Sequence, residues 1–158
     1  METLNTDIFD LFNRKWGLLC AGDTEDHNAM TISWGGLGTL WGRPAATVYV
    51  RPTRLTYRYM EDNEYFTIGF FPEECRKALN DIYGTQSGRD TDKDKASGFT
   101  PAGCEHGVFY KEAVFTLVCR KMLAQPMDKT EMDEIGKRFY GDDEPHKIYI
   151  GEVIDIIR

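Results

Sequence analysis

Strand-like segments that follow one another without a helix between them constrain the fold of this chain most strongly. Residues 16–21, 28–34 and 44–50 are short, rich in apolar and β-branched side chains, and separated only by polar or glycine-containing turns. Because a parallel pair of strands needs a long crossover, usually a helix, we expect mainly antiparallel pairing. Further segments of this kind lie at residues 64–71, 108–110, 113–124 and 147–157. The pattern predicts a mainly β protein, a small β-barrel with peripheral helices, since closure removes exposed sheet edges.

Short helices are expected outside these strands. Thr6, Thr53 and Asp128 each stand where a side-chain oxygen would accept a hydrogen bond from the first helical turn. The predicted helices cover residues 7–12, 54–62, 72–83 and 128–139. We expect the glycine-rich residues 35–38 to break the regular structure between two strands. Residues 85–107 are expected to form a long loop with one helical turn.

Length and composition indicate one ordered domain spanning residues 1–158. A chain of 158 residues with 41% hydrophobic side chains can bury one continuous core, and it contains no repeat or linker. It lacks a membrane-length apolar stretch and the pattern of a secretion signal, so we expect a cytoplasmic protein. The four cysteines are far apart and are expected to be reduced thiols. The three histidines lack the spacing of metal ligands, so no metal is expected.

Charge is distributed unevenly along the chain. The net charge of −7 argues against binding to nucleic acid or to an anionic membrane, because both need a basic face. From His27 to Met60 there is no Asp or Glu, while the segment contains four arginines, so the rest of the chain carries −11. These are Arg43, Arg51, Arg54 and Arg58. The segment indicates a site for a small anion, most simply a phosphate-bearing ligand; alternatively it is buried strand whose arginines pair with acids elsewhere.

The junction between a strand and a helix at residues 50–58 is the most specific local feature. A helix N-terminus presents unpaired backbone N–H groups and the positive end of its dipole, which favours an anion. Arg51 precedes the predicted helix, Arg54 lies in its first turn, and Tyr57 follows three residues later on the same side. With the Thr53 hydroxyl, these groups would surround a phosphate. The alternative is an ordinary capped helix whose arginines pair with surface acids.

Residues 28–34 alternate between two kinds of side chain. Met30, Ile32 and Trp34 fall on one face, which we expect in the core. The other face carries small residues, which would leave room for a flat ligand; they are Ala29, Thr31 and Ser33. The glycine-containing loop at residues 87–93 is a second candidate for contact with an anionic ligand.

Motifs for hydrolysis, for a P-loop and for a Rossmann cofactor site are not present. The sequence contains no G-x-S-x-G, no Walker glycine-lysine loop and no G-x-G-x-x-G. If the protein is an enzyme, we therefore expect a bound cofactor to supply the reactivity, with the protein positioning it and tuning its electronics.

Five blocks of sequence together resemble the flavin reductase-like, flavoredoxin-type FMN-binding split barrels. The blocks occur in the family's order: His27–Trp34 (HNAMTISW), Val50–Arg54 with Tyr57, Ser87–Lys93 (SGRDTDK), Gly98–Thr100 (GFT) and His146–Val153 (HKIYIGEV). The resemblance implies a Greek-key split barrel that forms a homodimer, with one FMN per subunit near the dimer interface. The chain departs from the family at Asp94, where an aromatic or apolar residue would be expected after the lysine.

The resemblance also implies which residues bind the cofactor. The isoalloxazine ring would lie along the strand containing Asn28, Met30, Thr31, Ile32, Ser33 and Trp34. The phosphate would be held by the segment containing Arg51, Pro52, Thr53, Arg54 and Tyr57. The loop that closes over the flavin would contribute Ser87, Gly88, Arg89, Asp92 and Lys93.

The function implied by the resemblance is FMN-dependent oxidoreduction. NADH or NADPH would be the electron donor, and a small molecule or a protein the acceptor. This chemistry requires no side chain as an essential acid or base, so no catalytic residue is assigned. Two alternatives remain: a flavoredoxin-type electron carrier reduced by a partner protein, and a binding or sensor domain that uses the same barrel for haem or a nucleotide. His27 and His146 would be the candidate haem ligands.

Overall fold

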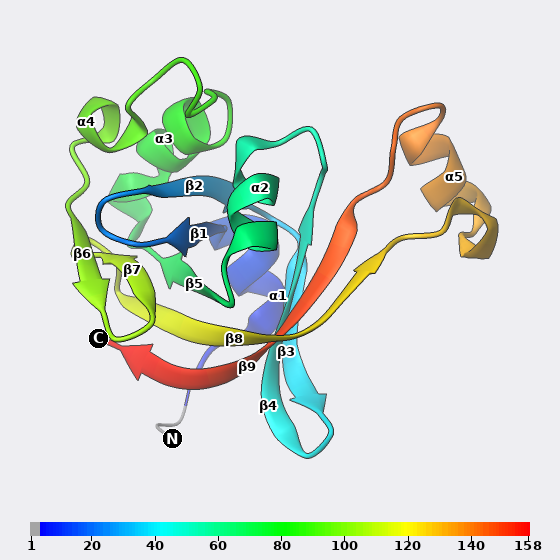
Figure 1. Cartoon of the computed structure of the whole chain (residues 1–158), viewed down its shortest axis with the longest axis horizontal. Helices are drawn as coiled ribbons and strands as arrows, with labels where there is room; N and C mark the ends of the chain where they lie inside the picture. Colours follow the sequence, from blue (N-terminus) through cyan, green and yellow to red (C-terminus); the bar gives the residue numbers. More distant parts are fainter. Residues whose placement is uncertain (1–3) are drawn as a thin grey trace.

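Seven antiparallel strands form the main sheet of the protein in a computed structural model that describes residues 4–158. Their order is β2-β1-β5-β8-β9-β4-β3 (Figure 1), and β6 and β7 form a separate hairpin. The strands are β1 Gly17–Gly22, β2 His27–Ile32, β3 Gly35–Leu40, β4 Arg43–Val50, β5 Tyr65–Phe70, β6 Pro101–Cys104, β7 Gly107–Tyr110, β8 Phe115–Pro126 and β9 Lys147–Ile157. The prediction of a mainly β, antiparallel fold is confirmed.

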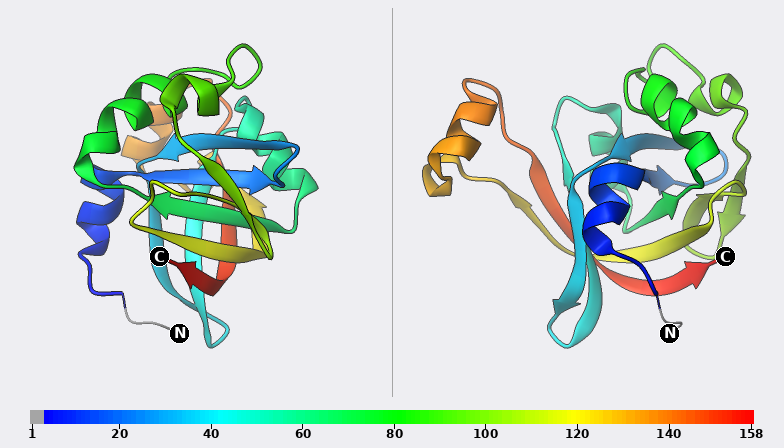
Figure 2. Two further views of the ribbon diagram at one scale, coloured as in Figure 1. Left: turned by 90° about the vertical axis from the view of Figure 1, so that its left-hand side faces the viewer. Right: turned by 180° about the vertical axis from the view of Figure 1, so that it is seen from behind.

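The sheet is strongly coiled, and β2 and β3 are its two edge strands. The long strands β8 and β9 pair with irregularities between Val118 and Cys119 and between Lys121 and Leu123, where local bulges bend the ladder. Beyond the second irregularity both strands extend away from the body of the protein as an arm. Figures 1 and 2 show that this arm carries α5 at its tip.

Two apolar clusters pack on opposite faces of the sheet. Leu19 belongs to a cluster with Phe66 and Leu117, whereas the preceding Leu18 belongs to a second cluster with Tyr83 and other aromatic residues. Both leucines are fully buried, because successive residues of a strand point to opposite faces and β1 is covered on both. All four cysteines are free thiols, as expected.

Helices and single helical turns cover these faces. The α-helices are α1 Ile8–Asp10, α2 Leu55–Asp62, α3 Arg76–Ala78, α4 Lys93–Ser97 and α5 Glu134–Tyr140. Residues 73–75 and 129–131 form 3-10 turns, and residues 11–15 and 79–83 form wider π-helical turns. Met60 of α2 packs in the first cluster and Leu79 in the second, so these two segments lie on opposite faces of the β1–β2 region. Among the described residues, no helix has the length and apolar character needed to cross a membrane.

The helix caps differ from the prediction. Asp7, not Thr6, caps the first helix, and its carboxylate accepts hydrogen bonds from the N–H groups of Phe9 and Asp10 at 2.9 and 3.2 Å. Asp133 caps α5, and Asp128 caps only the preceding 3-10 turn. In both cases an aspartate nearer the helix start places a full negative charge next to the positive end of the helix dipole.

Two segments contain more regular structure than predicted. Gly35–Leu40 is strand β3, which pairs with β4 through a turn in which Trp41 and Gly42 have positive φ values of 51° and 70°. Two successive residues with left-handed backbone conformation form a tight hairpin turn. The chain therefore turns at Trp41 and Gly42 and not, as predicted, at residues 35–38. Residues 85–107, predicted as a loop with one helical turn, also contain β6.

Candidate functional site

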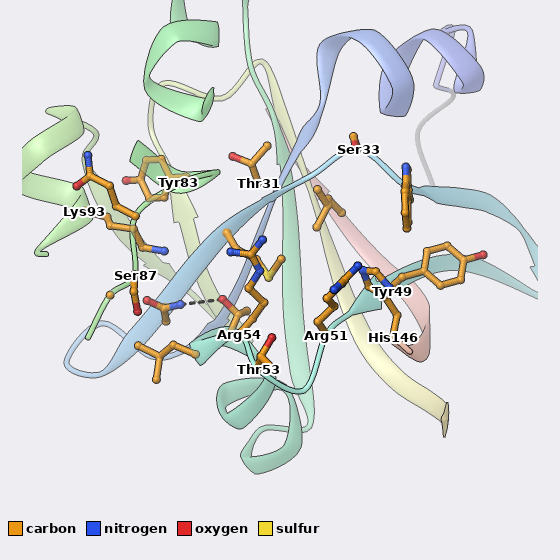
Figure 3. Close-up of a pocket in the computed structure, with 18 of the residues that line it drawn as sticks. Thr31, Ser33, Tyr49, Arg51, Thr53, Arg54, Tyr83, Ser87, Lys93 and His146 are labelled. Atoms are coloured by element: carbon orange, nitrogen blue, oxygen red, sulfur yellow. Dashed lines mark hydrogen bonds between the residues drawn. The ribbon is translucent and has the colours of Figure 1, made fainter. Parts of the chain in front are cut away.

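A pocket of about 470 Å³ lies along β2, between the junction of β4 with α2 and the loop before α4. Its volume is in the range of small-molecule and cofactor sites. Figure 3 shows Lys93, Tyr83 and Ser87 at one end, Tyr49 and His146 at the other, and Arg54 between them.

The pocket follows the free edge of β2. All six residues of the predicted ring-binding strand line it. Neighbouring residues of a strand point to opposite faces, so consecutive residues share a pocket only along the strand edge. β1 is the one described strand that pairs with β2, so backbone N–H and C=O groups on the other edge are available to a ligand.

The small-residue face of the strand, predicted to lie against a flat ligand, is shared between the protein interior and the pocket. Ala29 on that face is buried against the second apolar cluster, and the Thr31 hydroxyl donates a hydrogen bond to the Leu79 carbonyl at 2.6 Å. The strand ends at Ile32, and Trp34, expected in the core, is 45% exposed. Ala29 packs against the second apolar cluster, whereas Thr31 and Ser33 line the pocket, so part of the small-residue face is available to a ligand.

A buried hydrogen bond joins β2 to α2 within the pocket. The Asn28 amide donates to the Thr56 hydroxyl at 2.7 Å, and both residues line the pocket and are almost fully buried. This hydrogen bond therefore fixes the distance between the free edge of β2 and the start of α2.

The predicted phosphate-binding segment is brought to the pocket in part. Arg51, Thr53 and Arg54 line it, whereas Pro52 and Tyr57 do not. Arg54 is the N-cap of α2 and has an extended backbone (φ −76°, ψ 141°), so helical spacing starts one residue later than predicted. For that reason Tyr57 does not share a side with Arg54 and packs against the first apolar cluster instead. The Thr53 hydroxyl does not cap the helix, which also corrects the prediction.

The arginines of the acid-free segment differ in their partners. Arg43 pairs with Glu152 at 3.0 Å and Arg51 with the exposed Asp143 at 3.3 Å. The alternative of pairing with acids elsewhere therefore holds for these two. Within residues 4–158, the guanidinium of Arg54 makes no ion pair or hydrogen bond, although it faces the pocket. An arginine without a partner beside a helix N-terminus is suited to binding an anion.

The opposite end of the pocket is aromatic. Trp34 lies 5.1 Å from the ring of Phe139 and 5.2 Å from that of His146, and all three residues line the pocket. The Nδ1 atom of His146 lies 2.6 Å from the Tyr140 hydroxyl. Burial, and then the nearby charges of Arg51 and Arg54, lower the pKa of His146 to about 4, so this imidazole is neutral at neutral pH.

The loop before α4 brings four of its five predicted residues to the pocket. Ser87, Gly88, Arg89 and Lys93 line it. Asp92 instead accepts a hydrogen bond from the Lys95 N–H as the cap of α4, and it faces a neighbouring pocket of about 510 Å³. The Lys93 ammonium is buried and donates a hydrogen bond to the Ala29 carbonyl. Burial lowers its pKa to about 8.

The pocket as a whole is suited to an anionic, partly flat ligand. Its lining contains four cationic side chains and no Asp or Glu, although the protein is acidic overall. The cations are Arg51, Arg54, Arg89 and Lys93. The edge of β2 offers backbone donors and acceptors, and the aromatic end offers apolar surface.

The comparison with known protein families decides the assignment. The sequence matches the model of the flavin reductase like domain over residues 9–158. The chain belongs to the flavin reductase-like family. No curated protein matches the sequence.

Solved structures support the fold of this flavin reductase-like protein. Flavoredoxin from Methanosarcina acetivorans is 20% identical, with a TM-score of 0.73, and the match covers 99% of this chain and 74% of that one. An FMN-binding protein from Thermus thermophilus is 17% identical, with a TM-score of 0.72 over 100% and 80% of the two chains. The NADH:FAD oxidoreductase of Streptomyces globisporus is 16% identical, with a TM-score of 0.69 over 91% and 75%. These likenesses show a shared fold.

Several pocket residues of this flavin reductase-like protein could not be assigned from the sequence. They are Tyr49, Leu55, Thr56, Tyr83, Gln86 and Phe139, and His146 was expected only as a candidate haem ligand. Thr56 lies within the predicted anion-binding segment, between Arg54 and Tyr57, so its position in the first helical turn was the available signal. Phe139 and His146 come from the arm, far along the chain, and no local pattern placed them beside β2.

Proposed function

We propose that this protein binds FMN in the pocket along β2 and acts as a flavin reductase-like oxidoreductase. The observation that carries the proposal is the unpaired Arg54 guanidinium, which faces an acid-free pocket at the start of α2. The phosphate would lie between Arg51 and Arg54, and the ring would lie along the free edge of β2. The names of the FMN-binding and flavoredoxin structures of the same fold agree with this ligand.

The residues present fit FMN. A dianionic phosphate needs cations and helix N–H groups, and the pocket provides both. Its lining contains no carboxylate, and the one carboxylate paired with Arg51 is that of the exposed Asp143. The polar edge of an isoalloxazine ring needs both donors and acceptors, which the unpaired edge of a strand supplies. The Asn28 to Thr56 hydrogen bond fixes the spacing between these two parts.

Bound FMN would supply the hydride and electron chemistry, with NADH or NADPH as donor and a small molecule or a protein as acceptor. The protein binds and orients the cofactor. His146 is an unsuitable acid at neutral pH because its pKa is about 4. Its imidazole and the ring of Trp34 would exclude water from the open end of the pocket.

We also propose that the coiled sheet is the split barrel of this family and that the protein is a homodimer. Ile135 and Phe139 on α5 are 76% and 51% exposed, and Trp34, whose ring contacts that of Phe139, is 45% exposed. Large apolar side chains on a projecting arm favour contact with another protein surface. A second copy that packs against the arm would cover the aromatic end of the pocket.

Titration of the purified protein with FMN tests the proposal. Binding should quench flavin fluorescence and perturb its visible absorption, with one FMN per subunit at saturation. A protein that leaves both signals unchanged contradicts the assignment. A haem-type absorption band in the purified protein would support the haem-binding alternative.

Anaerobic reduction separates the enzyme from the electron carrier. An NAD(P)H-dependent reductase should bleach its bound flavin when NADH or NADPH is added alone. Bleaching that requires a partner reductase would show a flavoredoxin-type carrier. The solved structures of this fold include proteins with both kinds of name.

A further inference from the structure

A cluster of polar side chains lies behind the loop that borders the pocket, and Asp94 is at its centre. One carboxylate oxygen of Asp94 lies 2.8 Å from Nε2 of His27. The other accepts hydrogen bonds from the hydroxyls of Tyr83 and Tyr110 at 2.7 and 2.9 Å.

The three partners of Asp94 come from three separate elements. His27 begins β2, Tyr83 ends the π-helical turn at residues 79–83, and Tyr110 ends β7. Asp94 itself is the second residue of α4. A single carboxylate therefore ties α4, and with it the loop at residues 87–92, to the body of the protein.

His27 is held in its protonated form by this arrangement. Its Nδ1 atom lies 2.8 Å from the carbonyl oxygen of Asp23, and its Nε2 atom faces Asp94. A backbone carbonyl can only accept a hydrogen bond, and so can an ionised carboxylate, so both imidazole nitrogens must donate. In agreement, the hydrogen bond to Asp94 raises the pKa of His27. Burial acts to raise the pKa of Asp94, but the hydrogen bond from His27 and those from the two tyrosines lower it overall.

Lys93, the residue before Asp94, connects this cluster to the pocket. Its ammonium is buried, donates a hydrogen bond to the Ala29 carbonyl, and lies 5.7 Å from the ring of Tyr83. Burial disfavours the charged form, whereas the negative charge of Asp94 favours it. Without that charge, the ammonium of Lys93 would lose its proton at a lower pH.

We propose that Asp94 is a positioning residue of the pocket, which fixes α4 so that Lys93 presents a charged ammonium to the bound ligand. The proposal rests on the proposed FMN site, because there the ammonium faces an anionic cofactor. Asp94 lines only the neighbouring pocket and not the pocket along β2, so it acts through Lys93.

Both titrating groups, His27 and Lys93, lose positive charge as pH rises. The raised pKa of His27 means that its ion pair with Asp94 is fully present below about 6.5 and is lost as pH rises through the higher folded value. The Lys93 ammonium is lost as pH rises through about 8. Affinity for an anionic ligand should therefore fall from neutral to alkaline pH. The other charged or titratable groups that face this cluster are Cys20, Asp23, Arg54, Tyr83 and Tyr110.

Asp94→Asn tests the proposal because the amide keeps an oxygen for both tyrosines and removes the charge. The matched control is Asp90→Asn, which removes a charge from an exposed residue of the same loop whose carboxylate makes no hydrogen bond within the described chain. FMN affinity is measured by fluorescence quenching between about pH 6.5 and 9.5, where the phosphate is mainly dianionic. Wild type and Asp90→Asn should lose affinity through a midpoint near pH 8. In Asp94→Asn the midpoint should fall by about one unit, and affinity near pH 7.5 should fall by about 3-fold.

A measurement on the ligand-free protein separates this proposal from the FMN site. NMR titration of isotope-labelled lysine side chains should show a lower Lys93 midpoint in Asp94→Asn and an unchanged one in Asp90→Asn. A Lys93 midpoint that is the same in Asp94→Asn and wild type overturns the proposal, whether or not FMN binds. If the midpoint shifts as expected but wild type does not bind FMN, only the proposed function is wrong.

A second variant keeps the test decisive if Asp94→Asn does not fold. His27→Gln retains the carboxylate of Asp94 and removes the imidazolium, so the Lys93 midpoint should not fall. Hydrogen exchange at residues 87–97 should become faster, because the tie between α4 and β2 is weakened. Unchanged exchange in this variant would contradict a positioning role for the cluster.

Discussion

His146 shows how a single residue connects the pocket to the acid stability of the protein. Its pKa is about 4 in the folded protein and 6.5 when unperturbed, so the unfolded state binds its proton first. This residue therefore lowers stability progressively as pH falls from about 6.5 to 4. His146→Gln should keep a hydrogen bond to Tyr140. It should also remove about 2 kcal/mol of the acid destabilisation across that window, less than the full pKa difference implies because solvent screens this partly buried imidazole.

Urea denaturation of the ligand-free protein at several pH values measures this effect. His106→Gln is a suitable control, because His106 stacks on Tyr65 away from the pocket. Identical loss of stability in acid for wild type and His146→Gln would show that the imidazole is not held in its neutral form.

The sequence predicted individual pocket residues well where the signal was local. Arg51, Thr53 and Arg54 follow one another at the end of β4, so any structure with this junction places them together. Tyr57 was predicted wrongly as a pocket residue from helical spacing, because the helix starts at Leu55 and not at Arg54. A shift of one residue turns a helical side chain by about 100°.

At the scale of elements, the loop before α4 approaches strand β2 so closely at Gly88 that there is no space for a side chain. A Cβ atom at this position would lie 2.2 Å from Oδ1 of Asn28 and 3.1 Å from Leu55. Gly88→Ala should therefore displace Asn28 and break its hydrogen bond to Thr56. We expect FMN affinity to fall by about 1 to 2 kcal/mol, roughly 5- to 30-fold.

The control for this prediction is Gly36→Ala in β3, where an added Cβ has no atom of the described chain within 4 Å. Both substitutions replace glycine with alanine at positions without a positive φ, so they differ in the close approach that each one meets. FMN affinity of both variants is measured by fluorescence titration. Equal affinity would show that the close approach of the loop to Asn28 does not determine how the pocket binds FMN.

The sequence predicted the strands and failed at several helix starts and at β3. Strands such as β9 were recognisable because apolar and β-branched residues predominate in them, and in β9 Gly151 is the one helix breaker. A helix starts where one of several neighbouring polar side chains accepts hydrogen bonds from the first free N–H groups. Asp7 and Asp133 do so in this protein, whereas Thr6 and Asp128 were expected. The Gly35–Leu40 segment has weak intrinsic strand preference, and its pairing with β4 provides what the local sequence lacks.

At the scale of the whole molecule, the arm formed by β8, β9 and α5 is the part that the sequence could not place. Its residues lie far along the chain from β2, yet Phe139 and His146 border the same pocket. Arg51 connects the two parts, since it pairs with Asp143 and lies 5.6 Å from the rings of Phe139 and Tyr140. Such contacts depend on tertiary packing and leave no local pattern.

The proposed homodimer predicts a specific effect of a charge on this arm. Phe139→Asp places a carboxylate on an exposed apolar surface, so it should leave the subunit folded and shift the protein from dimer to monomer. Light scattering coupled to size-exclusion chromatography measures the mass. Val114→Asp, at a residue that is 55% exposed and outside the arm, should remain dimeric. A monomeric wild-type protein at micromolar concentration would contradict the homodimer.

The central claim, that the phosphate of FMN binds beside Arg54, is tested most directly by comparing FMN with riboflavin, which lacks the phosphate. Wild type should bind FMN more tightly than riboflavin. In Arg54→Gln, FMN affinity should fall by about 1.5 to 3 kcal/mol while riboflavin affinity stays the same. Arg58→Gln, on the exposed side of the same helix, should behave as wild type. Equal loss of affinity for both ligands in Arg54→Gln, or no preference for FMN in wild type, would contradict the account.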